Sequence, residues 1–209
     1  MVLMHHVPAI VTKLFSGMLW NKCRKENKIY LTFDDGPVPG VTDFVLEELD
    51  KREMKATFFM VGDNVKKHPQ LALNVAEAGH GIGNHTFHHL NGYYASFDNY
   101  LSDIESCEYV FEEVLEQNSS LFRPPYGKLT KKQFEAIKSK YQVVMWDVLS
   151  GDYDQRQSPT KCLSKTKKYS RNGSIILFHD QLKTQQVLKK ILPDYLDFVQ
   201  DTGFQTAVL

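Results

Sequence analysis

The sequence has no excess of charge of either sign, because 25 Lys and Arg residues balance 25 Asp and Glu residues in a chain of 209. Such a balance argues against nucleic acid as a partner, since no long-range field would attract a polyanion. Cysteine is also scarce: the three residues Cys23, Cys107 and Cys162 lie far apart and form no C-x-x-C pair. The sequence therefore predicts neither a disulfide framework nor a thiolate metal site.

The chain also lacks long hydrophobic runs, repeats and linkers rich in Gly or Ser. Residues 1–20 are apolar, but Lys13 interrupts them, no basic cluster precedes them and no small-residue cleavage site follows. We expect a helix that packs on the domain, with a weak interfacial anchor as the alternative. Three apolar side chains would share its face: Ile10, Leu14 and Met18. We therefore predict an N-terminal helical segment over 1–27, no firm membrane anchor, and a location in the cytoplasm or, through this segment, at a membrane surface.

From residue 28 onward, strand-like and helix-like segments alternate. Seven runs rich in β-branched and aromatic residues predict strands over 29–33, 56–61, 81–85, 121–123, 142–146, 174–178 and 204–208. Amphipathic patterns predict helices from 42, over 69–78, 98–117 and 130–141, from 158, and over 184–202. This alternation is typical of parallel β/α units. The fold class predicted for 28–209 is thus α/β, a single domain with a distorted (β/α) barrel of seven or eight strands. An open doubly wound sheet is the alternative.

Unusual polar residues fall at or just after the ends of these predicted strands. They are Asp34, Asp35, His85, Arg123, Asp152 and His179. In parallel β/α folds the active site is assembled where the carboxyl ends of the strands meet. We therefore expect these side chains to converge on one face of the barrel, although Asp-Gly-Pro alone would more often be a simple turn.

The pattern is typical of a metal site with a catalytic base beside it. His85 and His89 have i,i+4 spacing, which suits two nitrogens on one zinc ion, while His88 remains ambiguous. With one carboxylate, two histidines serve either metal-assisted hydrolysis or a non-haem iron oxygenase. A hydrolase also needs a base and an acid, which Asp34 and His179 offer, so we favour the hydrolase.

Five ordered motifs in the chain resemble those of the polysaccharide deacetylases, the NodB-homology group or carbohydrate esterase family 4. The motifs are Thr32-Phe33-Asp34-Asp35-Gly36-Pro37, His85-Thr86-x-x-His89, Arg123-x-Pro125-Tyr126, Asp152-Tyr153 and Leu177-Phe178-His179. The resemblance covers residues 28–180 and implies a distorted β/α barrel. It further implies a metal-dependent enzyme that removes acetyl groups, most often N-acetyl groups, from an amino sugar or polysaccharide.

The resemblance also implies a role for each matching residue. Asp35, His85 and His89 would bind zinc, or another divalent metal such as cobalt, nickel or manganese. Asp34 would be the general base and His179 the general acid. Arg123 would orient Asp34, and Asp152 would stabilise the charged form of His179. The Tyr126 N–H would bind the oxyanion of the reacting substrate, and Leu177 would contact the acetyl methyl group. The aromatic ring of Tyr153 would form part of the substrate pocket.

One residue departs from the family pattern, because Tyr153 stands where the family usually has Trp. We expect a changed substrate pocket and an unchanged mechanism. Two other functions remain open: an inactive, metal-bearing protein that binds carbohydrate, and a metal hydrolase of the same fold that acts on a non-sugar amide. The sequence predicts neither the identity of the sugar polymer nor the oligomeric state.

Overall fold

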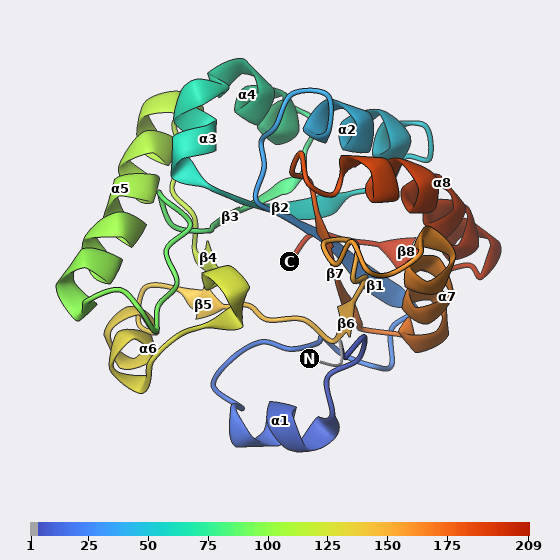
Figure 1. The fold of residues 1–209 in the computed structure, drawn as a ribbon, viewed down its shortest axis with the longest axis horizontal. Coiled ribbons are helices and arrows are strands. Elements are labelled where there is room, and N and C mark those ends of the chain that lie inside the picture. Colours follow the sequence, from blue (N-terminus) through green and yellow to red (C-terminus); the bar gives the residue numbers. More distant parts are fainter. Residues whose placement is uncertain (1–3) are drawn as a thin grey trace.

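The computed structural model describes residues 4–209, which form one curled parallel sheet surrounded by helices (Figure 1). The eight strands are β1 (Lys28–Asp34), β2 (Ala56–Met60), β3 (Gly81–Asn84), β4 (Leu121–Phe122), β5 (Gln142–Val143), β6 (Val148–Leu149), β7 (Ile175–His179) and β8 (Gln205–Thr206). Their order is β5-β4-β3-β2-β1-β7-β6, and β8 pairs with the start of β1. The predicted single-domain α/β fold with a distorted barrel is confirmed.

The helices lie around the outside of the curled sheet (Figure 1). They are α1 (Ala9–Leu14), α2 (Thr42–Asp50), α3 (Gly62–Lys67), α4 (Pro69–Glu77), α5 (Phe97–Leu115), α6 (Lys131–Ile137), α7 (Pro159–Tyr169) and α8 (Gln185–Asp201), with a 3-10 turn η1 (Pro125–Gly127). Three of these helices begin at an N-cap residue whose side chain binds the first helical turn. The hydroxyls of Ser96, Thr130 and Ser158 accept backbone hydrogen bonds from the first turns of α5, α6 and α7.

The central strands are buried on both faces, with apolar side chains on the outer face and polar side chains on the inner face near the strand ends. Phe33 of β1 points toward the helices and stacks between Phe58 and Phe178, with ring centroids 5.2 and 5.7 Å away. Because successive side chains of a strand point to opposite faces, the neighbouring residues Thr32 and Asp34 point into the barrel. The apolar outer face anchors the sheet, while the inner face carries polar groups toward the strand ends.

The N-terminal segment contacts the domain differently from our expectation. Helix α1 is only six residues long, and none of its side chains is buried. The contacts come from extended residues on either side, because Leu19 pairs with the β5 end and His5 with β6. Leu19 N–H donates to the Val143 carbonyl at 2.8 Å, and Leu149 N–H donates to the His5 carbonyl at 3.0 Å. The segment thus crosses the gap between the two edge strands of the barrel.

Lengths explain the remaining differences between the predicted and observed elements. The strand predicted over 142–146 stops at Val143, and the two-residue strand β6 was not predicted. The six-residue helix α3 was not predicted either. Elements this short span too few residues to show a hydrophobic period. No helix among residues 4–209 has both the length and the apolar character that crossing a membrane requires.

Candidate active site

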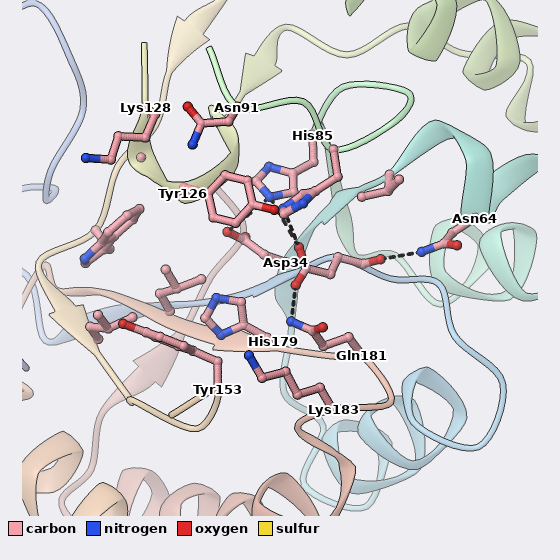
Figure 2. Close-up of a pocket in the computed structure, with 17 residues that line it drawn as sticks. Asp34, Asn64, His85, Asn91, Tyr126, Lys128, Tyr153, His179, Gln181 and Lys183 are labelled. Carbon is pink, nitrogen blue, oxygen red and sulfur yellow. Dashed lines mark hydrogen bonds and ion pairs between the residues drawn. The ribbon is translucent and has the colours of Figure 1, made fainter. Parts of the chain in front are cut away.

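The predicted site residues lie together at the carboxyl ends of the strands (Figure 2). Asp34 ends β1 beside His179, which ends β7, and the two residues are partners in the sheet register. His85 follows β3, and Arg123 follows β4. Together with the loops after β4 and β6, these ends form an open pocket of about 640 Å³. The topology therefore brings residues that are up to 145 positions apart in sequence to one rim.

Asp35, His85 and His89 form a group that could hold a metal ion. One potential ligand atom from each lies within 4.8 Å of the others. The Nε2 atoms of His89 and His85 are 3.0 and 3.5 Å from Asp35 Oδ1. This carboxylate oxygen is buried and has no hydrogen-bond partner among residues 4–209. A buried, unpaired carboxylate oxygen that faces two imidazole nitrogens fits a cation, because such groups are otherwise expensive to bury.

The backbone carbonyl of Arg123 determines which nitrogen of His85 faces this group. His85 Nδ1 lies 2.7 Å from that carbonyl oxygen, so the Nδ1–H donates and the Nε2 lone pair is left free. A hydrogen bond from the second ring nitrogen is the usual way in which proteins fix a metal-binding histidine. The contact also connects the His85–His89 motif to the Arg123–Tyr126 motif.

Two residues that we did not predict hold Asp35 in place. Gln181 Nε2 donates to Asp35 Oδ2, and Asn64 Nδ2 donates to the Asp35 carbonyl at 2.7 Å. Burial acts to raise the pKa of the Asp35 carboxyl, but His85 and His89 hold this pKa well below its usual range. Asp35 is therefore a carboxylate. The only signal for Gln181 in the sequence is a weak one, its position two residues after the motif residue His179.

Left-handed backbone conformations concentrate at this site. Asp35, Thr86, His89 and Tyr126 have φ angles of 84°, 63°, 56° and 60°, and none of them is glycine. Such conformations cost on the order of 1–3 kcal/mol each and persist where the surroundings determine them. Four strained residues within three motifs indicate that the fold maintains the geometry of the pocket at the expense of stability.

Arg123 is fully buried and binds Asp34. Its Nη1 donates to Asp34 Oδ1 at 2.6 Å and to Thr32 Oγ1 at 2.8 Å, while Nη2 donates to the Met145 carbonyl at 2.9 Å. The guanidinium carbon also lies 4.0 Å from the ring centre of Phe59. Burial lowers the pKa of Arg123, and the Asp34 carboxylate opposes this. Because Arg123 fixes one carboxylate oxygen, the orientation of Asp34 is determined.

Asp152 binds His179 through both carboxylate oxygens. Oδ1 lies 2.8 Å from His179 Nδ1, and Oδ2 accepts the His179 backbone N–H at 2.8 Å. Burial acts to lower the pKa of His179, but Asp152, with smaller contributions from Asp35 and Asp34, raises it to about 9. The imidazole is therefore charged at neutral pH, and its Nε2 side is left for the pocket.

The residues expected to meet the substrate also line the pocket. The Tyr126 side chain is 61% exposed, and its ring lies 4.6 Å from that of His89. The Tyr153 ring packs edge-on against His179 at 5.2 Å. Leu177 is buried in the pocket wall. Three further apolar side chains that line the pocket were not predicted as site residues: Val61, just after β2, and Trp146 and Leu149 in the short β5–β6 region.

His88 does not belong to the metal-binding group. Its Nδ1 lies 2.6 Å from Asp103 Oδ1, on helix α5, and its side chain is 63% exposed. Asp103 Oδ2 accepts the backbone N–H groups of Phe87 and His88 at 3.0 and 2.9 Å. The ambiguity of His88 is thereby resolved: it helps to fasten the His85–His89 loop to α5.

Asp180 supports the Asp34–Pro37 turn from below and was not predicted. Its Oδ1 accepts the Gly36 N–H at 3.1 Å, and its Oδ2 accepts the Thr42 hydroxyl at 2.6 Å. A Cβ on Gly36 would lie only 2.1 Å from Asp180 Oδ2, so glycine is required there. Burial raises the pKa of Asp180 to about 8, against the lowering effect of Thr42.

Comparisons with known proteins agree with this geometry. The family model for polysaccharide deacetylases matches residues 21–144. A peptidoglycan-N-acetylglucosamine deacetylase of Bacillus cereus is 35% identical over 181 residues, which is 84% of each chain. A chitooligosaccharide deacetylase of Azorhizobium caulinodans is 33% identical over 159 residues, which is 75% of each chain. Other matched relatives are longer, and the aligned part covers 34% to 60% of their length.

A solved structure resembles the whole chain. It is a crystal structure of a peptidoglycan N-acetylglucosamine deacetylase in complex with 4-naphthalen-1-yl-N-oxidanyl-benzamide. Its TM-score is 0.89 at 27% identity, and the match covers 97% of this chain and 95% of that one. The chain belongs to the polysaccharide deacetylase family. The predicted class is thereby confirmed: a carbohydrate deacetylase, which hydrolyses carbon–nitrogen bonds other than peptide bonds.

Proposed function

We propose that this chain removes N-acetyl groups from an amino sugar within a glycan, using the pocket at the ends of β1, β3, β4 and β7. The observation that carries the proposal is the arrangement around Asp35, His85 and His89. These residues could hold a metal ion. The same pocket contains Asp34, which Arg123 binds, and His179, which Asp152 binds. One carboxylate and one imidazolium beside a metal are the base and the acid that amide hydrolysis requires.

The proposed cofactor is zinc, with Asp35, His85 and His89 as its ligands. Two imidazoles and one carboxylate are a common protein ligand set for zinc in catalytic sites. When bound, the ion would acidify water and polarise the acetamide carbonyl. Cobalt, nickel or manganese remain alternatives, and metal analysis of the purified protein after dialysis against each ion tests the choice.

Asp34 is proposed to accept the proton from the attacking water. Arg123 holds its Oδ1 at 2.6 Å and leaves Oδ2 directed into the pocket, 3.8 Å from His85 Nε2. Replacing Asp34 by Asn should retain the ion, because the ligand group is intact, yet lower turnover about 10²–10⁴-fold, because the amide accepts a proton poorly. Steady-state acetate release measures this. A variant with near wild-type turnover would place the base elsewhere.

His179 is proposed to protonate the leaving amine on the other side of the scissile bond. Asp152 binds Nδ1, so the proton donated would come from Nε2. The Tyr126 N–H is proposed to stabilise the oxyanion, and Leu177 to contact the acetyl methyl group. Tyr153 would present its ring to the sugar and confine His179.

The substrate class rests on the relatives and on the open, aromatic-lined pocket. Two matched relatives carry names that specify peptidoglycan N-acetylglucosamine and chitooligosaccharides. We propose an acetylated amino sugar of one of these glycans as the substrate. The test is acetate release by the zinc-loaded protein from chito-oligosaccharides, peptidoglycan fragments, acetylated xylan and a non-sugar acetamide.

Each result of this screen has a distinct meaning. Release from the amino sugars, abolished by a chelator and restored by zinc, would support the proposal. Release from the non-sugar acetamide alone would favour a hydrolase of another substrate class. Binding of sugars without any release would favour the inactive carbohydrate-binding alternative. The division into an N-terminal segment, 1–27, and a catalytic domain, 28–209, and the location in the cytoplasm or at a membrane surface remain predictions.

A further inference from the structure

The pocket contains two lysines that the proposed chemistry does not use. Lys128 follows η1, and Lys183 lies in the loop between β7 and α8. Both are exposed, and neither forms an ion pair within residues 4–209. Figure 2 draws them at opposite edges of the pocket, with the catalytic groups between them. The overall charge of the protein is balanced, so this positive charge is a local feature.

The surroundings of Lys128 present further donors and restrain its side chain. Its backbone carbonyl packs closely on Gly92, where a Cβ would lie 2.5 Å away. The ammonium group lies 5.1 Å from the ring centre of Tyr93. Asn91 of the same loop lines the pocket, and its Oδ1 accepts the Tyr93 N–H at 3.0 Å. That bond directs the amide so that its NH₂ group remains available as a second donor at this edge.

Lys183 faces the opposite side of the pocket. One carboxylate close enough to interact with it is Asp154, whose pKa is lowered to about 2, mainly by its hydrogen bond with Arg156 and to a smaller extent by the charge of Lys183. Arg156 already binds Asp154 through two contacts, Nε to Oδ1 at 2.8 Å and Nη2 to Oδ2 at 2.9 Å. The paired Asp154 therefore does not neutralise Lys183. Inside the pocket, Arg123 pairs with Asp34, and Asp35 faces His85 and His89 in the group that could hold a metal ion.

We propose that Lys128 with Asn91, and Lys183, bind an anionic substituent of the glycan, so that the preferred substrate is an acetylated amino sugar next to a carboxylate or phosphate group. The inference rests on the proposed function, because it assumes that the glycan lies across this pocket. A neutral glycan could accept hydrogen bonds from the two ammonium groups but would leave their charges unpaired. An acidic glycan would gain an attraction that salt weakens.

The experiment is a binding comparison that does not require turnover. Trp146 lines the pocket, and its fluorescence can report ligand binding by the metal-loaded enzyme. The probes are the disaccharide of N-acetylglucosamine and N-acetylmuramic acid, the methyl ester of its carboxyl group, and diacetylchitobiose. N-acetylglucosamine 6-phosphate against N-acetylglucosamine forms the phosphate arm. The ester keeps the carbon skeleton of the acid, removes its charge and adds one methyl group.

The wild-type protein should bind the acid more tightly than its ester, and this preference should decline between about 0.15 and 0.5 M salt. Lys128→Gln and Lys183→Gln should each weaken binding of the acid about two- to fivefold and leave the ester unaffected. Lys190→Gln, an exposed position on α8 outside the pocket, is the control for the loss of one charge.

Equal affinity within both arms, acid with ester and N-acetylglucosamine 6-phosphate with N-acetylglucosamine, would overturn the inference, as would an equal effect of Lys190→Gln. A preference in the phosphate arm alone would support the anion site and identify phosphate as its ligand; a preference in the disaccharide arm would identify the carboxylate. These outcomes are independent of catalysis. If the metal-loaded wild-type protein released no acetate from any substrate, the proposed function would be contradicted. The binding comparison would still show whether the pocket prefers an anionic ligand.

Discussion

At the scale of single residues, Asp34 and Asp35 are adjacent in sequence but have different partners. The φ angle of 84° at Asp35 turns the chain sharply after β1, so the two carboxylates diverge. Asp34 meets Arg123, and Asp35 meets the two histidines. In the proposed mechanism, the same side-chain chemistry therefore supplies a proton acceptor at one position and a metal ligand at the next.

Replacing any one of Asp35, His85 and His89 by Ala should abolish both metal retention and activity. Removing one of three protein ligands leaves the ion with too few donors, and the affinity falls sharply. Elemental analysis of the purified variants measures metal content directly. His88→Ala is the matched control, because His88 pairs with Asp103 and should retain the ion. Full metal occupancy in all three ligand variants would contradict the assignment.

The pair of Asp152 and His179 predicts a pH dependence. Burial alone would lower the pKa of His179, but Asp152 raises it to about 9. The acid must be protonated to act, so turnover should be sustained at neutral pH and decline as the pH rises through about 9. Asp152→Asn removes the carboxylate charge, and the decline should then occur at lower pH. Turnover at about pH 8 should suffer more than turnover at about pH 6.

Rate–pH curves of both proteins, at equal metal content, measure this shift. Asp154→Asn is a suitable control, because Asp154 lies in the same loop but pairs with Arg156. A curve for Asp152→Asn that overlays the wild type on its basic side would show that Asp152 serves only the loop structure. The backbone contact from His179 N–H to Asp152 would then be its main contribution.

At the scale of elements, strands of five to seven residues and capped helices could be predicted from sequence. The β-branched and aromatic run of β1 and the capping box at Thr130 and Gln133 are local signals. Strand β6 and helix α3 have two and six residues and were not predicted, whereas the equally short strands β4, β5 and β8 were found within longer predicted runs. The motif residues were found because they follow strands, whereas Asp103 was missed because it lies on a helix. Asp180 also follows a strand, but only the structure shows that it binds Gly36 and Thr42.

Helix α5 supports the metal-binding loop through Asp103. This carboxylate accepts the backbone N–H groups of Phe87 and His88 and pairs with the His88 ring. Asp103→Ala should lower the free energy of unfolding by about 1–3 kcal/mol, because the His88 N–H loses its acceptor and the Phe87 N–H keeps only the Asp103 backbone carbonyl at 3.1 Å. It should also weaken metal binding by about tenfold, since the loop carries His89. Denaturant unfolding and metal titration measure the two effects.

His88→Ala is the control that separates the two contacts of Asp103. It removes the side-chain pair and keeps both backbone acceptors, so its effects on unfolding and on metal affinity should be much smaller. Equal effects of Asp103→Ala and His88→Ala would show that the exposed ion pair, rather than the backbone contacts, fastens the loop. That result would be unexpected for a histidine that is 63% exposed.

At the scale of the whole molecule, the barrel is not closed by strand pairing alone. Strands β5 and β6 are the two ends of the sheet order, and the N-terminal segment lies across them (Figure 1). Its residues bridge Val144 and Val148. The sequence predicted a helix that packs on the domain through one apolar face. Helix α1 has no buried residue, and the contacts described here are extended backbone bridges, which leave no hydrophobic period in the sequence. Unpaired edges invite association with other chains, so the segment also protects the sheet.

The attachment of this segment depends on Asp147, a buried residue just before β6. Its Oδ2 accepts from Arg24 Nη2 at 2.9 Å and from the Ser174 hydroxyl at 2.6 Å. Arg171 lies farther away, 3.6 Å from Oδ1, and is more exposed. Removing a charged partner from a buried carboxylate costs more than removing an exposed one, because the remaining charge loses a close hydrogen bond. Arg24 and Arg171 thus differ in their expected contribution although both contact Asp147.

We therefore predict that Arg24→Met lowers the free energy of unfolding by about 1.5–3 kcal/mol, whereas Arg171→Met changes it by less than about 1 kcal/mol. Denaturant unfolding followed by tryptophan fluorescence measures both, since Trp20 and Trp146 lie on either side of the junction. Arg24 also donates to the Asn172 carbonyl at 2.7 Å, so its removal weakens the link between the N-terminal segment and the turn before β7 as well. Equal, small effects of the two substitutions would mean that the backbone bridges alone hold the segment across the barrel.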